Sequence, residues 1–281
     1  MKKWLKTLAA STALVLSLAA CGTDEDGGAS ESKPETEDKK IVVGASNIPH
    51  AEILEKAKPI LEEEGVELEV QVFSDYILPN RALEDKEIDA NYFQHIPYME
   101  LQMKEEGYKF ANAGGIHIEP IGIYSKKHKS LEDIPEGGTI IMRDSVADHG
   151  RILMIFQEKG LIKLKDGIDK TSATIDDIVE NPKKLKFKPD VEAGLLPQIY
   201  NNDEGDAVVI NANYALDAGL DPVNDPIAVE SKKDNPYVNV ITVRKGDEDR
   251  AEIKKLVEVL KSKEIQDYIN EQYKGAVVPA E

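Results

Sequence analysis

Short apolar strands alternate with amphipathic helices along most of the chain, and this alternation restricts the fold more than any other feature. Residues 40–45 form an apolar run that ends in a turn, residues 50–64 carry apolar side chains at helical spacing, and residues 66–72 alternate with period two. A strand, a helix and a strand in this order form by default a right-handed crossover between parallel strands. The pattern therefore predicts an α/β fold.

The alternation continues to the C-terminus in two sets. The further segments expected are a helical turn after Pro79, strands near 88–90, around 116 and at 121–124, 139–142, 207–210 and 237–243, and helices at 97–106, 150–159, 250–261 and 264–272. A lysine-rich stretch, residues 126–129, separates the two sets, and the strand at 237–243 returns after the second. We therefore predict two lobes, residues 40–124 plus 238–281 and residues 125–237, with a ligand cleft between them.

The N-terminus has the three zones of a secretory signal. Three lysines precede an apolar stretch, residues 8–20, which is shorter than the roughly 20 residues that a membrane-spanning helix needs. Small residues then lead to Cys21, the single cysteine, so no intramolecular disulfide can form. Leu-Ala-Ala-Cys resembles the bacterial lipobox, which implies a signal peptide at residues 1–20 and acylation of Cys21. The alternative is a buried N-terminal helix.

Residues 21–39 have almost no apolar side chains and are rich in Gly, Ser, Thr, Asp, Glu, Pro and Lys. Such a segment cannot bury enough apolar surface to offset the entropy lost on ordering. We therefore expect a flexible acidic tether that holds the folded domain on the extracytoplasmic side of a cell membrane, through the lipid on Cys21.

The chain is strongly acidic, with a formal net charge of −18. An acidic surface repels the phosphate backbone of nucleic acids, and the sequence has none of the basic clustering that nucleic-acid-binding proteins use. We therefore exclude nucleic acid as a partner and interpret the charge as a solvated face.

Four segments carry polar and aromatic side chains where strands are expected to end. They are residues 74–80, 89–98, 117–120 and 143–151. The first two each precede a helix, and Pro79 and Pro97 suit the first helical turn, where their missing N–H would be unpaired anyway. Residues 91–95 are expected in a connection, where their aromatic and amide groups either line a binding pocket or pack in a core.

The other two segments carry charged groups. Period-two alternation puts His117 and Glu119 on one strand face, so that face either meets solvent or lines the cleft. Arg151 follows a predicted helix start, and backbone N–H groups together with an arginine fork would bind a carboxylate.

Seven motifs in these and neighbouring segments resemble those of the methionine-binding lipoproteins of bacterial ABC importers. They are Pro-His-Ala-Glu-Ile-Leu at 49–54, Asp-Tyr-Ile-Leu-Pro-Asn at 75–80, Ala-Asn-Tyr-Phe-Gln-His at 90–95, His-Ile-Glu-Pro-Ile-Gly-Ile-Tyr-Ser at 117–125, Glu-Asn-Pro-Lys at 180–183, Val-Ile-Asn-Ala-Asn-Tyr-Ala at 209–215 and Asn-Pro-Tyr-Val-Asn at 235–239. The resemblance extends from residue 41 to the C-terminus. It implies a two-lobed periplasmic-binding-protein fold, type II-like, that closes over one amino acid.

The resemblance also implies partners and roles for single residues. The protein would act as a monomer without cofactor or catalysis and would dock on the permease and ATPase of an importer. Arg151 would bind the ligand carboxylate, and Asn213 and Asn239 would contact the amino-acid head group, unless these asparagines serve as turn or cap residues. The residues implied to line the side-chain pocket are Tyr76, Phe93, His95, Tyr98 and His117. Further candidates are Asp148, Asn211 and Glu119.

Asp148 departs from the family pattern, which usually reads like Pro-Asn-Asp-Pro-Thr-Asn before Gly-Gly-Arg. Here residues 143–148 read Arg-Asp-Ser-Val-Ala-Asp. Asp148 suits the N-cap of the following helix, yet its charge would oppose a ligand carboxylate there. We therefore predict either a ligand other than free L-methionine or an Asp148 side chain that turns away, pairs with Arg143 or binds a ligand amino group.

Three other functions remain open. A metal-capturing lipoprotein, for zinc, is suggested by the five histidines, His50, His95, His117, His128 and His149. They form no HxH or HxxxH pair, and only His95, His117 and Glu119 are expected to meet, so we expect no metal site. An exported hydrolase would use Ser145, Asp148 and His149, but the sequence lacks a Gly-x-Ser-x-Gly elbow. An adhesin would share the anchor and the tether.

Overall fold

The structure is a computed structural model that describes residues 39–280. The predicted signal peptide, Cys21 and the predicted tether up to residue 38 lie outside the described residues. Among residues 39–280, no helix has the length and apolar character needed to cross a bilayer.

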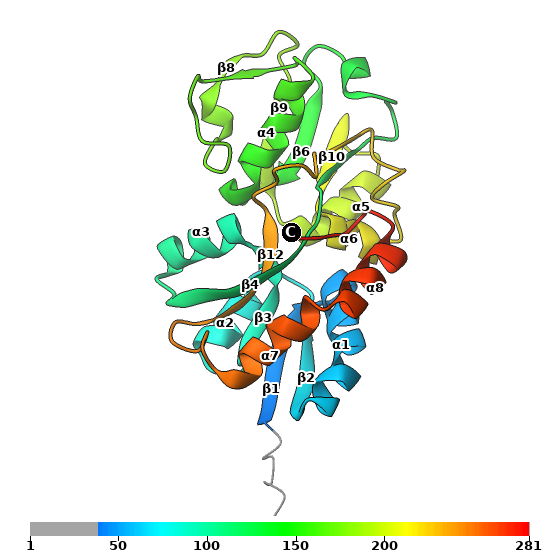
Figure 1. The fold of residues 1–281 in the computed structure, drawn as a ribbon. Helices are drawn as coiled ribbons and strands as arrows, with labels where there is room; N and C mark the ends of the chain where they lie inside the picture. The colour runs from blue at the N-terminus through cyan, green and yellow to red at the C-terminus, as the bar shows by residue number, and fades with distance from the viewer. Residues whose placement is uncertain (1–38, 281) are drawn as a thin grey trace, which may run out of the picture. The chain divides into compact units, whose positions relative to one another are not determined.

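The first lobe is built on a six-stranded sheet with the order β13–β4–β12–β3–β1–β2 (Figure 1). Its strands are β1 (Lys39–Ser46), β2 (Val66–Phe73), β3 (Ala90–His95), β4 (Phe110–Ile118), β12 (Val238–Arg244) and β13 (Val278–Pro279). Its helices are η1 (Asn47–Ala51), α1 (Glu52–Glu63), α2 (Leu78–Glu84), α3 (Ile96–Glu106), α7 (Ala251–Leu260) and α8 (Lys263–Tyr273). Apolar side chains of α1, α7 and α8 form a core against β1, β2 and β3.

The second lobe is built on a five-stranded sheet with the order β11–β5–β10–β6–β9. Its strands are β5 (Gly122–Tyr124), β6 (Thr139–Arg143), β9 (Lys186–Val191), β10 (Ala207–Ile210) and β11 (Ala228–Val229). Its helical segments are η2 (Leu131–Asp133), η3 (Val146–Asp148), α4 (His149–Glu158), η4 (Ile175–Asp177), η5 (Ala193–Leu195), α5 (Leu196–Asn201) and α6 (Ala212–Asp217). A separate pair, β7 (Lys163–Leu164) and β8 (Ile178–Glu180), completes the lobe. This lobe has a core of its own, in which apolar side chains of α4 pack against β6.

The predicted β1–α1–β2 crossover is confirmed, because β1 pairs with β2 and β3 in parallel. Pro79 and Pro97 stand in the first turns of α2 and α3, as expected. Local periodicity predicted these elements because each buries one face against the sheet.

Two expectations about strands were wrong. Residues 91–95 do not form a connection but lie in β3, between β1 and β12, where all six residues are buried. The strand tolerates Asn91 and Gln94 because their amides bond to each other and to Asn80. Residues 122–124, expected in the first lobe, form β5, which pairs with β10 and β11 of the second sheet. A strand this short carries no local signal for the sheet that it joins.

Two chain segments connect the sheets, residues 119–121 between β4 and β5 and residues 230–237 between β11 and β12. A third apolar cluster contains side chains of both lobes, among them Tyr76 and Phe93 of the first and Tyr214 of the second. The lobes are therefore in contact beside the carboxyl end of β3.

Candidate functional site

A polar cavity lies where the two lobes meet. Its lining residues are Tyr76, Phe93, Gln94, His95, Tyr98, Glu119, Arg143, Arg151, Asn211, Ala212, Asn213 and Asn239. Nine of the sequence-predicted residues are in this set, and Gln94, Arg143 and Ala212 were not predicted to line it. The free space between the side chains is about 20 Å³, room for about one water molecule. An amino acid can therefore enter only if the lobes or these side chains move apart.

The Asp148 side chain is fully buried beside this cavity and contacts groups of both lobes. Its Oδ2 accepts a hydrogen bond from Arg143 Nη1 at 2.9 Å and from Asn211 Nδ2 at 3.2 Å. Its Oδ1 lies 2.9 Å from His95 Nε2 and 3.5 Å from Arg151 Nη1. Burial raises the pKa of Asp148, but the charges of Arg143 and Arg151 and the hydrogen bond from His95 outweigh it, so the pKa lies well below its ordinary value.

Pairing with Arg143 was one of the alternatives predicted for Asp148, and the structure confirms it. Asp148 occupies the N-cap position of α4, as predicted, but its side chain makes no cap hydrogen bond to that helix. Its oxygens are already engaged by Arg143, His95 and Asn211. Since the carboxylate is neutralised by the protein's own arginine, it does not have to repel a ligand carboxylate.

His95 links the lobes as a neutral ring. Burial lowers its pKa, and its Nδ1 accepts from the backbone N–H of Tyr98 at 3.2 Å, so the proton lies on Nε2 and faces Asp148. The same acceptor caps α3, which begins at Ile96. The group of possible metal ligands among the described residues contains His117 and Glu119 but not His95, contrary to the expectation made for a metal site.

Arg151 is 3% exposed and binds a residue that the sequence did not single out. Its Nε lies 3.1 Å from each carboxylate oxygen of Glu230, and its Nη2 donates to Glu230 and, at 2.7 Å, to the backbone oxygen of Glu119. The guanidinium also lies 4.4 Å from the centre of the Tyr237 ring. Its remaining nitrogen, Nη1, contacts only Asp148 among the described residues, at 3.5 Å. Nη1 is therefore the nitrogen that can still bind a ligand carboxylate.

Two asparagines of the second lobe carry unused polar atoms. Asn213 Oδ1 accepts from the Tyr76 hydroxyl at 2.5 Å, a bond between the lobes. Asn213 Nδ2 and Asn211 Oδ1 are buried and have no partner among the described residues. Buried polar atoms are normally hydrogen-bonded, so this donor and this acceptor are suited to polar groups of a ligand.

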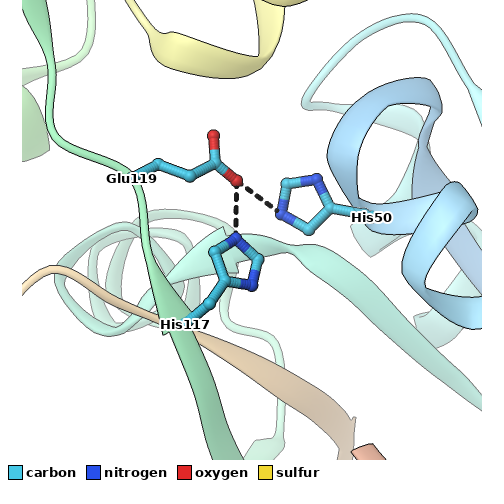
Figure 2. Close-up of side chains that lie close together, drawn as sticks. All are labelled: His50, His117 and Glu119. Carbon is cyan, nitrogen blue, oxygen red and sulfur yellow. Dashed lines mark hydrogen bonds and ion pairs between the residues drawn. The ribbon is translucent and has the colours of Figure 1, made fainter. Parts of the chain in front are cut away.

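Glu119 forms a buried cluster with two histidines of the first lobe (Figure 2). Its Oε1 lies 2.7 Å from His117 Nε2 and 3.1 Å from His50 Nε2. His50 Nε2 is also 3.1 Å from Asn239 Oδ1, and the Tyr92 hydroxyl contacts His117 Nδ1. Burial lowers the pKa of His50 to about 4 and that of His117 to about 3, so both rings are neutral at physiological pH.

This cluster corrects two expectations. His117 does not line the cavity but is fully buried behind Glu119. His50, which was not predicted as a site residue, takes the place expected for His95. The donor atoms of His50, His117 and Glu119 lie within 4.8 Å of one another, but hydrogen bonds account for their contacts without a metal ion. The single sequence signal for His50 was its motif at 49–54, since 67 residues separate it from His117.

The residues of the hydrolase alternative form no catalytic triad. Ser145 Oγ and both ring nitrogens of His149 are buried without a hydrogen-bond partner among the described residues. Asp148 bonds to Arg143 and His95 instead. A nucleophile needs a base within hydrogen-bond reach, which Ser145 lacks here.

Comparisons of the sequence and the fold with known proteins identify the family of this chain. The model of the NlpA lipoprotein family matches residues 41–281. The chain is 53% identical to the methionine-binding lipoprotein MetQ of Bacillus subtilis, over 93% of each chain, and 39% identical to the D-methionine-binding lipoprotein MetQ of Escherichia coli K12, over 97% of each. A solved nutrient-binding protein of Burkholderia cenocepacia bound to methionine is 43% identical, with a TM-score of 0.80 over 86% of this chain and 100% of that one. None of these relatives supports the zinc alternative. The chain therefore belongs to the NlpA lipoprotein family and has the two-lobed fold of its substrate-binding proteins.

Proposed function

We propose that this protein is the substrate-binding component of an ABC importer and that it captures methionine, or a close relative of methionine, between its lobes. The observation that carries the proposal is the set of polar groups that line the cavity. Arg151 Nη1 and Asn213 Nδ2 are donors on the second lobe. Glu119, which follows β4, and Asn239 of β12 provide oxygen atoms to the cavity lining. Such donors can bind the carboxylate of an amino acid, and such acceptors can bind its ammonium group.

The aromatic residues of the cavity suit a thioether side chain. Tyr76, Phe93 and Tyr98 lie next to one another, with ring centres 5.9 to 6.2 Å apart. Sulfur makes favourable contacts with aromatic rings at about 5 Å. The names of the two curated relatives and the methionine in the Burkholderia cenocepacia protein support the same ligand.

Lobe closure is the proposed mechanism. Arg151 and Asn213 belong to the second lobe, and Tyr76, Phe93 and His95 to the first, so a bound amino acid would join both. A ligand that contacts both lobes stabilises the closed form relative to an open one, and the closed form would then be recognised by the permease and its ATPase.

Titration calorimetry with L-methionine is expected to give a dissociation constant in the nanomolar to micromolar range, with X-ray scattering showing a smaller radius of gyration once the ligand is bound. L-Norleucine, which replaces sulfur by a methylene, is the matched control and should bind more weakly. Failure to bind L-methionine or any of its close relatives, or binding without compaction, would contradict the proposal.

We also propose that Cys21 carries a lipid that keeps the domain at the outer side of the cell membrane, as a monomer. The lipobox-like sequence and the membership in a lipoprotein family support this anchor. Replacing Cys21 with alanine should move the protein from the membrane fraction to the soluble fraction of expressing cells, while its affinity for the ligand stays unchanged. A Cys21→Ala protein that stays in the membrane fraction would refute the anchor.

A further inference from the structure

A second, larger hollow lies next to the cavity between the lobes. This outer hollow has a volume of about 340 Å³. Ile77 and Val146, which line it from the first and the second lobe, are 57% and 40% exposed, so the outer hollow is reached from solvent. Among the described residues, Tyr76, Tyr98 and Arg143 line both the cavity and the outer hollow. These three side chains therefore form the wall between the two spaces.

Arg143 completes this wall from the end of β6 in the second lobe, whereas both tyrosines belong to the first lobe. Its guanidinium carbon lies 4.9 Å from the ring centre of Tyr76 and 5.1 Å from that of Tyr98, and its Nη1 donates to Asp148 Oδ2 at 2.9 Å. Burial lowers the pKa of Arg143, but the charge of Asp148 outweighs this effect and raises the pKa above its ordinary value, so the group stays charged. A guanidinium held by an ion pair and by two aromatic rings resists displacement.

The wall stands where the side chain of a bound amino acid would end. The rings of Tyr76, Phe93 and Tyr98 are proposed above to contact a thioether, and Arg143 lies against two of these rings. The free space beside them is about 20 Å³, whereas the volume of the outer hollow reaches the range of small-molecule sites. A side chain too long for the cavity could therefore extend only into the outer hollow, and it would have to displace a residue of the wall to do so.

We propose that Arg143 is a specificity-determining residue that limits the length of the ligand's side chain. When the lobes meet, its guanidinium lies against Tyr76 and Tyr98 and separates the cavity from the outer hollow. A side chain that ends inside the wall permits this contact, whereas a longer thioether holds Arg143 away from the rings and keeps the lobes apart. The inference rests on the proposed function, because it concerns the far end of the same ligand.

Selection by this wall takes place when the lobes close, because the wall contains residues of both lobes. In an open form Arg143 moves away from the tyrosines together with its lobe, so a long ligand can contact one lobe without meeting the wall. Closure over such a ligand would displace Arg143 and leave Asp148 without its closest arginine. The closed form, which is the one proposed for recognition by the permease, would thus exclude thioethers with a bulky group on sulfur.

The test compares L-methionine with S-butyl-L-homocysteine, which carries a butyl group on sulfur in place of the methyl group. Calorimetry should show that wild-type protein binds the butyl compound at least about 100-fold more weakly, because breaking a buried ion pair such as Arg143–Asp148 has effects of this size. Arg143→Ala/Asp148→Asn removes the pair and opens the wall. This variant should bind the two compounds within about threefold of each other, since the butyl group can then extend into the outer hollow.

Arg143→Met/Asp148→Asn is the matched control, because it removes the same two charges but keeps a long side chain in the wall. It should still bind the butyl compound at least about 10-fold more weakly than L-methionine, the usual effect of overpacking a closed site. X-ray scattering adds a readout that altered stability alone would not move. The butyl compound should reduce the radius of gyration of the alanine variant but not that of the wild type. Thermal unfolding shows whether each variant is folded during the titration.

The wild-type measurements decide the matter even if a variant does not fold. If the wild type binds L-methionine and the butyl compound equally well, or becomes compact with both, Arg143 does not limit the side chain and the proposed function stands. The same conclusion follows if the folded alanine variant gains no relative affinity for the butyl compound, or if the methionine variant discriminates no better than the alanine variant. If the wild type does not bind L-methionine at all, the proposed function fails and this inference fails with it.

Discussion

Replacing Arg151 is expected to reduce the affinity for L-methionine by about 30-fold to more than 1000-fold, the range found when one member of a buried charge pair is removed. Arg151 Nη1 is the guanidinium nitrogen that the described residues leave without a hydrogen bond. Lysine cannot reproduce the planar fork of the guanidinium group. Arg151→Lys should therefore bind only slightly better than a neutral variant. Titration calorimetry measures each affinity directly.

Arg151 also neutralises Glu230, so a single replacement of Arg151 could weaken binding by destabilising the fold. The double variant Arg151→Gln/Glu230→Gln removes both charges together, so no unpaired carboxylate remains. The matched control is Arg250→Gln, since Arg250 is ion-paired with Asp89 before β3, at the opposite end of that strand from His95. Near wild-type affinity in the double variant, or a loss in Arg250→Gln as large as in the double variant, would show that Arg151 does not hold the ligand.

Asp148→Asn is expected to destabilise the protein by about 3–5 kcal/mol, the usual result of leaving one charge of a buried pair uncompensated. Arg143 is 5% exposed, and its guanidinium lies 4.9 Å from the ring centre of Tyr76 and 5.1 Å from that of Tyr98. It would keep its charge in this position without a carboxylate. For a domain of this size, each kcal/mol corresponds to about 2–4 °C in Tm, which thermal or denaturant unfolding can resolve.

The paired variant Arg143→Met/Asp148→Asn should recover most of this loss, because it removes both charges together. A double variant as unstable as Asp148→Asn would mean that the loss does not come from the unpaired arginine.

The pH dependence of the free energy of unfolding tests the contribution of Asp148 independently. The pKa of Asp148 in the folded protein lies well below that of an unfolded aspartate, about 3.9, so its contribution is complete above that value and is lost as the pH falls below it. Asp148→Asn should therefore flatten the loss of stability in acid.

The local part of the fold could be predicted because strands and helices bury one face at a fixed period. The β1–α1–β2 crossover and helices α3, α7 and α8 follow from this rule. Strand β3 did not, because a central strand buried on both faces can hold Asn91 and Gln94 once their amides bond to each other. Strand β5 was assigned to the wrong lobe because pairing with β10 is a long-range choice.

Most of the candidate site was predicted through motifs, and the missing members are those that depend on contacts between distant segments. Tyr76, Phe93, Tyr98 and Asn213 were singled out and do line the cavity. Glu230 was missed, although it binds Arg151 from 79 residues away, and so was His50. No spacing rule connects such pairs.

The sequence by itself determined the α/β class, the candidate lipobox at Cys21 and the segments that carry the polar groups of the cleft, because signal, periodicity and motif are local properties. Only the tertiary structure decided which carboxylate meets which cation. Asp148 could have faced a ligand, Arg143 or solvent, and it faces Arg143. Glu119 could have met an arginine, and it meets two neutral imidazoles. Which charges meet in a low-dielectric interior depends on the folded arrangement of several elements, and no local sequence pattern specifies that arrangement.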